Sequence, residues 1–257
     1  MSVDLWRCVE DGDGLRAPRS HPEPVLSVIL SGASVLLEEG RAVIVEAATG
    51  LLTSAGVTYR TAHPFGCGDM GCHVRPSASL LRELRLPRDR WTRVPLTTRA
   101  YLRFRLAVEA MTRSRTDGLE LEEACLSLFA ANPELPSREM KPVTSRRHVE
   151  LVEDTKALLL RRFREPLSLD EVAKAVGTSA FHLARLFGRH TGFTLHGYRT
   201  RTRLLHALDR LEEARGTLTD LALELGYSSQ SHFTDAFRRA FGAPPGSLGR
   251  RAAFPAR

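Results

Sequence analysis

The apolar positions in the C-terminal part of the chain form one pattern that occurs twice. Residues 168–192, SLDEVAKAVGTSAFHLARLFGRHTG, align with residues 217–242, TLTDLALELGYSSQSHFTDAFRRAFG, at an offset of 49 residues that becomes 50 after one insertion. In each copy the apolar residues recur at helical spacing on both sides of a glycine. Each copy therefore predicts a short helix, a turn and a second helix, which is the layout of a helix-turn-helix.

Polar residues predict where the first helix of each copy begins. Ser168 and Glu171 have the spacing of a capping box, and Thr217 with Asp220 forms a weaker counterpart. A serine or threonine at this position accepts a backbone N–H that the helix leaves unpaired. The first helices are therefore expected to start directly after Ser168 and Thr217.

A glycine in each turn, Gly177 or Gly226, stands where the chain needs a positive φ to leave the first helix. The second helix is expected to begin near Ser179 or Ser228. Its buried face is predicted to consist of Phe181, Leu183, Leu186 and Phe187 in the first copy, and of Phe233, Ala236 and Phe237 in the second.

The opposite face of each second helix carries short polar and arginine side chains, which suit base edges in a major groove. Arg185 suits a guanine, Gln230 an adenine and Ala184 a thymine methyl. Asp235 either accepts from a cytosine amino group or orients a neighbouring arginine. For any one of these residues the alternative is a solvated surface position. The candidate base-reading residues are Ala180, His182, Ala184, Arg185, Ser229, Gln230, Ser231, His232 and Asp235.

The segment between the two copies, residues 194–214, has the apolar periodicity of one long helix. Such a helix spans roughly 30 Å, close to the ~34 Å that separates successive major-groove faces of B-DNA. One chain is thus predicted to reach two adjacent major grooves. Arg203 is expected to face inward and form an internal ion pair. The candidate phosphate contacts are Arg189, Arg199, Arg201, Arg238 and Arg239.

Charge is divided unevenly along the chain. The formal net charge is +7, and all of it falls in residues 146–257, where 19 Lys and Arg face 12 Asp and Glu. Residues 1–145 hold 18 of each sign. A basic module joined to a neutral one indicates a phosphate-facing domain and a partner domain, although a basic surface alone does not distinguish nucleic acid from other roles.

Residues 149–250 resemble the DNA-binding domain of the AraC/XylS-type bacterial transcription regulators. The resemblance rests on AxxxGTSxFHLxRLFxRxTGxTxxxYR in the first copy and LAxELGYSSQSHFTxAFRRAFGxPPG in the second, and covers about 40% of the chain. It implies seven helices, two helix-turn-helix motifs joined by a long helix, promoter binding, and RNA polymerase as a partner. Two features depart from the family: Asp235 replaces a basic residue that is common there, and PPGSLGR lacks the usual Tyr-Arg.

The N-terminal half has a different pattern. Short β-rich runs over Val25–Val57 are broken at Ser31-Gly32, Glu39-Gly40 and Thr49-Gly50-Leu51, which predicts a small sandwich or barrel. Residues 98–130 have the spacing of two amphipathic helices, which either close the barrel or pair with a second subunit. Residues 17–63 resemble the small cupin-type sensory barrel that often precedes the AraC-type module. The resemblance rests on Arg-Ser-His-Pro at 19–22, the Ser31-Gly32 turn, Gly50 and Ala55-Gly56.

The expected fold is therefore α+β with two domains. Residues 1–131 form a cupin-like sensory or dimerisation domain, with the barrel at about 15–80 and the helices at about 98–130. Residues 132–145, with three prolines, form a linker. Residues 146–257 form an all-α DNA-binding domain of about seven helices.

Candidate chemistry in the N-terminal half centres on histidines and cysteines. His21, Tyr59 and His63 are the candidate effector-pocket residues. A metal cupin needs more histidines than His21 and Glu23 with Tyr59 provide, so a catalytic metal is not expected. Cys67, Cys72 and His73 either bind a metal, sense oxidants, or lie in a glycine-rich loop whose thiols pack against the barrel. Cys125 is expected to be a helix-core thiol.

These observations favour a sequence-specific transcription regulator controlled by a small-molecule effector, with promoter DNA as its partner and a homodimer as one possible state. The alternatives are a cupin-type metal-dependent enzyme with a basic appendage, and a regulator switched through the Cys67/Cys72 loop. No nucleophile–base constellation is evident and no cofactor is called for. No apolar run approaches the ~20 residues of a membrane span, and the first residues lack the features of a signal peptide, so a cytoplasmic protein is expected.

Overall fold

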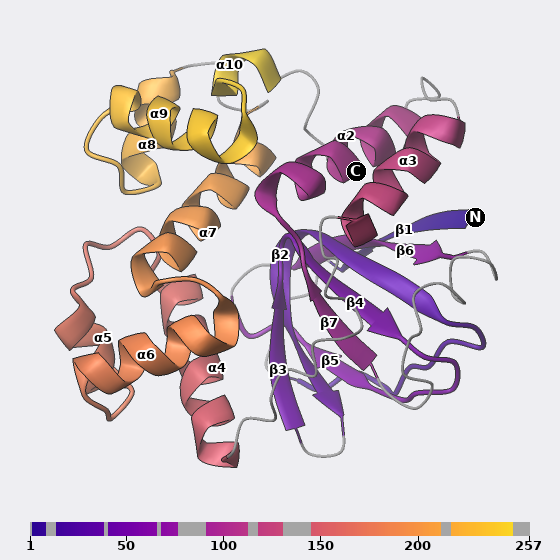
Figure 1. Cartoon of the computed structure of the whole chain (residues 1–257), viewed down its shortest axis with the longest axis horizontal. Coiled ribbons are helices and arrows are strands. Elements are labelled where there is room, and N and C mark those ends of the chain that lie inside the picture. The colour runs from indigo at the N-terminus through magenta and orange to yellow at the C-terminus, as the bar shows by residue number, and fades with distance from the viewer. Residues whose placement is uncertain are drawn as a thin grey trace. The chain divides into compact units, whose positions relative to one another are not determined.

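The computed structural model describes residues 2–8, 14–38, 41–65, 68–76, 91–112, 118–130, 145–211 and 217–248. These residues divide into two compact units, residues 2–130 and residues 145–248 (Figure 1). The first unit contains an antiparallel sheet and two helices, and the second is entirely helical. The linker predicted at 132–145 lies outside the described residues except for Ser145.

Seven strands among the described residues form the N-terminal sheet, in the order β1-β6-β2-β4-β7, with β3 and β5 both pairing with β2. All of the pairings are antiparallel, and the end strands β1 and β7 do not pair with each other within the described residues. The sheet is therefore not closed as a barrel there. The strands are β1 Ser2–Cys8, β2 Val25–Glu38, β3 Arg41–Glu46, β4 Thr49–Thr53, β5 Arg60–Ala62, β6 Asp69–Arg75 and β7 Trp91–Pro95.

Strand β2 runs straight through the turn that was predicted at Ser31-Gly32. Its register shifts between Ile29 and Ser31, and Gly32 has a φ of +75°. A side chain at Gly32 would collide with the carbonyl of Gly68. The glycine thus serves a β-bulge rather than a hairpin. Beyond the bulge, β2 changes partners from β4 and β6 to β3 and β5, so one strand builds both parts of the sheet.

The turn predicted at Thr49-Gly50-Leu51 is also displaced, because these residues begin β4. The chain turns at Ala47 and Ala48 instead, and Ala48 has a φ of +60°. The Ala47 amide donates to the carbonyl of Gly32, and the Ala48 amide to that of Ile29, each at 3.1 Å. Those two bonds to the bulge offset the strain of a positive φ at a non-glycine residue. The Glu39-Gly40 turn lies outside the described residues.

The two helices predicted over 98–130 are confirmed as α2 Thr98–Thr112 and α3 Gly118–Ala130, which lie side by side against the sheet (Figure 1). Tyr101 and Arg105 of α2 donate to the carbonyl of Leu30 in β2, the second bond at 2.9 Å. Cys125 of α3 is fully buried, as expected for a core thiol. The two bonds to Leu30 attach α2 to the middle of β2.

The C-terminal unit contains seven helices within the described residues. They are α4 Arg146–Arg161, α5 Leu169–Ala175, α6 Ala180–Thr191, α7 Leu195–Arg210, α8 Leu218–Glu224, α9 Gln230–Phe241 and α10 Pro245–Leu248. The long connecting helix is confirmed as α7, whose 16 residues span about 24 Å. Of the range expected for it, residues 212–214 lie outside the described residues.

The duplicated pattern is confirmed in both cores and caps. Ser168 accepts the Glu171 amide while the Glu171 carboxylate accepts from the Ser168 amide, so the capping box is complete. Thr217 accepts the amide of Asp220 in the same way. The core positions Leu183 and Phe187, like their counterparts Phe233 and Phe237, are fully buried. The C-cap glycines Gly192 and Gly242 both have a left-handed backbone.

Phe181 does not belong to the core, contrary to the prediction. Its side chain is 79% exposed, one of the most exposed apolar residues described. The helix α6 begins at Ala180, and its buried stripe consists of Leu183, Leu186 and Phe187. Phe181 precedes Leu183 by two residues, which turns it to the opposite side of the helix.

Within the described residues, no helix is both long enough and apolar enough to cross a lipid bilayer.

Replacing each turn glycine, Gly177 or Gly226, with alanine should lower the stability of the protein by different amounts. Both have a left-handed φ, +72° at Gly177 and +81° at Gly226. A Cβ at Gly177 meets nothing within 4 Å, whereas a Cβ at Gly226 would collide with the Arg164 carbonyl. Gly177→Ala should therefore cost only the backbone strain, about 1 kcal/mol, and Gly226→Ala at least about 3 kcal/mol. Urea unfolding of the full chain followed by circular dichroism measures both, and equal losses would contradict the close packing around Gly226.

Candidate functional site

Helix α6 presents its polar face to solvent because its apolar face is committed to the core. The Ser179 hydroxyl accepts the His182 amide at 3.3 Å and starts the helix. Opposite the buried stripe, the exposed side chains are Phe181, His182, Ala184, Arg185 and Arg189, whereas Ala180 is half-buried. The residues of this helix that the sequence proposed for DNA contact therefore lie on one exposed side, apart from Ala180. Phe181, which the sequence assigned to the core, lies on that side as well.

Helix α9 repeats the arrangement one unit later. Gln230, Ser231, His232 and Asp235 are exposed. Ser229 is the N-cap, and its hydroxyl accepts the His232 amide at 3.2 Å. Ser229 therefore orients the helix as well as lying at its exposed end.

Two side chains at the start of α9 are held by neighbours. The Thr219 hydroxyl donates to Gln230 Oε1 at 2.7 Å, so α8 orients the amide. The His232 ring shares a hydrogen bond with Ser228 and meets the Tyr227 ring edge-on, with centroids 5.3 Å apart. Both side chains are therefore preorganised rather than freely rotating.

The candidate phosphate contacts separate into two groups. Arg189, Arg238 and Arg239 are exposed on α6 and α9. Arg199 is half-buried, and its Nη1 donates to the carbonyls of Glu165 and Leu167.

Arg201 is only 8% exposed and lies over the Phe193 ring, which contradicts its expected place on the surface. The physical reason is helical geometry. Arg201 follows Tyr198 by three residues and precedes Leu205 by four, so it shares the buried face of α7 with both. A phosphate contact from this residue would need a different side-chain position.

Arg203 faces inward as predicted, but its recorded partners are backbone carbonyls rather than a carboxylate. Its Nε donates to Phe163 at 2.6 Å, and its Nη1 to Gly226 at 2.9 Å. Its Nη2 reaches the carbonyls of Arg164 and Glu165 at 3.2 and 3.4 Å. Burial is the main cause that lowers the pKa of Arg203 below its ordinary value. The guanidinium thus joins the segment before α5 to the turn after α8.

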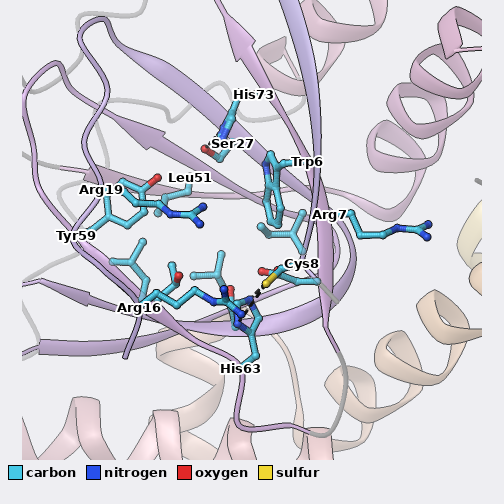
Figure 2. Close-up of a pocket in the computed structure, with 16 residues that line it drawn as sticks. Trp6, Arg7, Cys8, Arg16, Arg19, Ser27, Leu51, Tyr59, His63 and His73 are labelled. Carbon is cyan, nitrogen blue, oxygen red and sulfur yellow. Dashed lines mark hydrogen bonds and ion pairs between the residues drawn. The ribbon is translucent and has the colours of Figure 1, made fainter. Parts of the chain in front are cut away.

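A separate candidate site is a cavity of about 230 Å³ in the N-terminal unit, enclosed by residues from both halves of β2 (Figure 2). Tyr59 and His63, proposed from the sequence, line it. His21 adjoins it, since its Nε2 shares a 2.9 Å hydrogen bond with the Tyr59 hydroxyl.

One side of the cavity is a cluster of neutral imidazole and hydroxyl groups. The His21 and His73 rings meet edge-on at 4.8 Å, and His73 Nδ1 shares a 2.9 Å hydrogen bond with Ser27. Burial, with the neighbouring His21 and Arg75, lowers the pKa of His73 to about 4, and burial also lowers the pKa of His21. Both rings are therefore uncharged near pH 7 and can donate or accept hydrogen bonds.

The set Cys67, Cys72 and His73 is not brought together within the described residues. Cys72 is fully buried, and His73 lines the cavity. Neighbouring residues of a strand point to opposite faces, so the Cys72 thiol and the His73 ring are separated by the sheet itself. Cys67 lies outside the described residues.

The structure adds residues that the sequence did not single out. Trp6, Arg7, Arg16 and Arg19 line the cavity, and so do Cys8 and Asp69. The pairing of β1 with β6 places Cys8 opposite Asp69 across 61 residues of sequence, so no local motif signals it. The absence of a side chain at Gly71 leaves room for the Trp6 ring.

Comparison with known proteins matches the helical unit. A family model described as a helix-turn-helix domain matches residues 172–251. The regulatory protein SoxS of Escherichia coli K12 is 36% identical over 104 residues, which are 40% of this chain and 97% of SoxS. The transcriptional regulator ExsA of Pseudomonas aeruginosa is 30% identical over 128 residues, 49% of this chain and 45% of ExsA.

Among solved structures, ToxT from Vibrio cholerae covers 98% of both chains at 11% identity and a TM-score of 0.39. A regulator from Chromobacterium violaceum, described as having an AraC-type DNA-binding domain, is 30% identical over 43% of this chain and 95% of its own, with a TM-score of 0.37.

Because Arg203 bonds to carbonyls on both sides, its replacement by lysine should lower the stability of the helical unit strongly. Lysine keeps the charge but cannot reach the carbonyls on both sides, which leaves buried acceptors unpaired. Arg203→Lys should lower the free energy of unfolding of the helical unit by about 2–3 kcal/mol. The control Arg199→Lys, at a half-buried position, should cost under about 1 kcal/mol. Urea unfolding followed by circular dichroism compares them, and a similar loss in both variants would argue against a special role of Arg203.

Proposed function

Because the chain belongs to the AraC/XylS-type family of bacterial transcription regulators, we propose that α6 and α9 are the reading helices of two helix-turn-helix motifs, α5 with α6 and α8 with α9. The protein is a DNA-binding transcription regulator and not an enzyme, since the relatives that share this segment are regulators. We propose that the two helices enter successive major grooves of promoter DNA, which requires a cytoplasmic protein.

The observation that carries this proposal is the matched exposure of the two helices. Each helix buries one apolar stripe and exposes the opposite face of its first turns to solvent. A serine caps the start of each helix. We assign base contacts to Arg185 and Ala184 in α6 and to Gln230 and His232 in α9. Ala180, His182, Ser229, Ser231 and Asp235 remain candidates for further base contacts.

The exposed Phe181 extends this assignment. A large apolar side chain on the same side as His182 and Arg185 suits a thymine methyl or a deoxyribose. For phosphates we propose Arg189, Arg238 and Arg239, which are exposed. Arg199 and Arg201 are withdrawn from that role because both have internal contacts.

For the N-terminal unit, we propose that the sheet is a cupin-like sensory fold whose cavity binds a small effector carrying an anionic group. Arg16 and Arg19 line it with their side chains, whereas the side chain of Arg7 points away from it (Figure 2), and Asp69 is the single acidic residue among the described lining residues. The neutral His73 and Tyr59 supply further polar contacts, and the Trp6 ring supplies apolar surface. An excess of positive charge with a few placed polar groups favours small carboxylates. Homodimerisation and contact with RNA polymerase are further parts of this proposal, by family membership.

Replacing Arg185 or Arg189 of α6 with alanine should weaken DNA binding in two different ways, one dependent on the DNA sequence and one independent of it. Arg185→Ala should cost about 1–3 kcal/mol and relax discrimination at one base pair, because it removes a base contact. Arg189→Ala should weaken all sequences by the same factor and reduce the salt slope by about 1, because it removes a phosphate contact. Fluorescence anisotropy with the chain's own upstream DNA and single-base variants tests both. A uniform loss for Arg185→Ala would reassign it to phosphate, and wild-type binding no tighter than to random duplex would refute the function.

The effector proposal predicts charge-selective binding. Calorimetric titration with benzoate should show binding, whereas the matched neutral benzamide should bind at least about tenfold more weakly, because only benzoate gains an ion pair with a guanidinium. Arg19→Gln should remove this preference, while Arg103→Gln, on the exposed side of α2, should retain it. Equal affinities for the two compounds in the wild-type protein would contradict an anionic effector.

A further inference from the structure

Cys8 and His63 lie beside each other at one end of the cavity (Figure 2), and Asp69 completes a cluster with them. Cys8 is the last residue of β1 and Asp69 the first of β6, and the two are direct partners in the antiparallel ladder. His63 follows β5 and contacts both. Three strands that are separate in sequence thus bring a thiol, an imidazole and a carboxylate together.

The distances order these groups as thiol, base and orienting acid. The Cys8 Sγ lies 3.9 Å from His63 Nδ1, and His63 Nε2 lies 2.8 Å from Asp69 Oδ1. His63 and Asp69 are almost fully buried, at 3% and 4% exposed, whereas Cys8 is half-buried and lines the cavity. The carboxylate favours the tautomer with hydrogen on Nε2, which leaves the Nδ1 lone pair facing the thiol.

The same residues are also a candidate metal set, since one ligand atom from each lies within 4.8 Å of the others. The geometry argues against it. Asp69 is bonded to Nε2, whereas Cys8 lies at Nδ1 on the other side of the imidazole ring. A metal would bind His63 through one ring nitrogen, so it would have to replace either the bond from Nε2 to Asp69 or the contact of Nδ1 with Cys8.

We propose that Cys8 is a reactive thiol that captures an electrophilic effector of the α,β-unsaturated carbonyl class. This inference deepens the proposed effector site and rests on it. The thiol proton passes to His63 Nδ1, and the sulfur forms a bond to the β-carbon. The electron pair of the C=C bond moves into an enolate, whose α-carbon then takes the proton back from His63. Overall, S–H adds across the double bond, and no oxidant or reductant is needed.

The other described thiols provide a contrast within the same molecule. Cys72 and Cys125 are fully buried. Burial raises the pKa of the Cys125 thiol to about 12 and raises that of Cys72 as well, which suppresses their thiolates. Among the described cysteines, Cys8 alone combines access to the cavity with a neighbouring base.

The test is alkylation with limiting N-ethylmaleimide, followed by mass spectrometry of the peptides, in a Cys67→Ser background. Because His63 accepts the proton as the sulfur attacks, Cys8 should react about tenfold faster than glutathione at pH 7. Cys72 and Cys125 should remain unmodified in the folded protein. Cys8 reacting no faster than glutathione would overturn the proposal, and this comparison needs no active-site variant.

The variant His63→Gln distinguishes activation of the Cys8 thiol by His63 from simple accessibility of that thiol to the reagent. The variant should slow alkylation of Cys8 about tenfold at pH 7, because the attacking thiol loses the base that accepts its proton. Circular dichroism and DNA affinity verify its fold. An unchanged alkylation rate would overturn the role of His63, and one equivalent of zinc bound by the wild type but lost in His63→Gln would assign these residues to a metal. Calorimetric titration of the unalkylated wild-type protein with benzoate tests the cavity independently of the reaction of the thiol, so failure of the two proposals is distinguishable.

Discussion

The buried guanidinium of Arg203 is the contact on which the helical unit depends most. It donates to the carbonyl groups of residues 163–165, which lead into α5, and to that of Gly226 in the turn after α8. The two copies of the repeat are thereby joined through α7 by charge-assisted hydrogen bonds out of water, where unpaired acceptors are costly. The lack of a side chain at Gly226 follows from this contact, because a Cβ would meet both the guanidinium and the Arg164 carbonyl. Fixed positions for α6 and α9 are the condition for reading two grooves with one chain.

Local signals in the sequence predicted most of the helical unit. The caps at Ser168 and Thr217, the positive-φ glycines and the buried phenylalanines depend on neighbours within a few residues. Phe181 was misassigned because an aromatic residue at the first turn of a helix fits either face until the helix start is known to one residue. Arg201 was misassigned because its type suggests a surface position while its phase on α7 turns it inward.

Long-range pairing explains why the N-terminal unit was harder to predict. The strands at Val25 and beyond were recognised from their composition, but Gly32 gives the same local signal for a hairpin turn and for a bulge. The bulge decides the fold, since it lets β2 serve two parts of the sheet that together enclose the cavity. Tyr59 and His63 were found from sequence, whereas Cys8 and Asp69 meet only through the β1–β6 ladder.

The measurement that tests the central claim most directly is selection of bound duplexes from a random DNA library with the full chain, followed by sequencing. Two reading helices held at a fixed distance predict two conserved blocks separated by one constant spacing of about 10–10.5 base pairs, so that both major grooves lie on one face of the DNA. A single conserved block, or two blocks with freely varying spacing, would contradict the account.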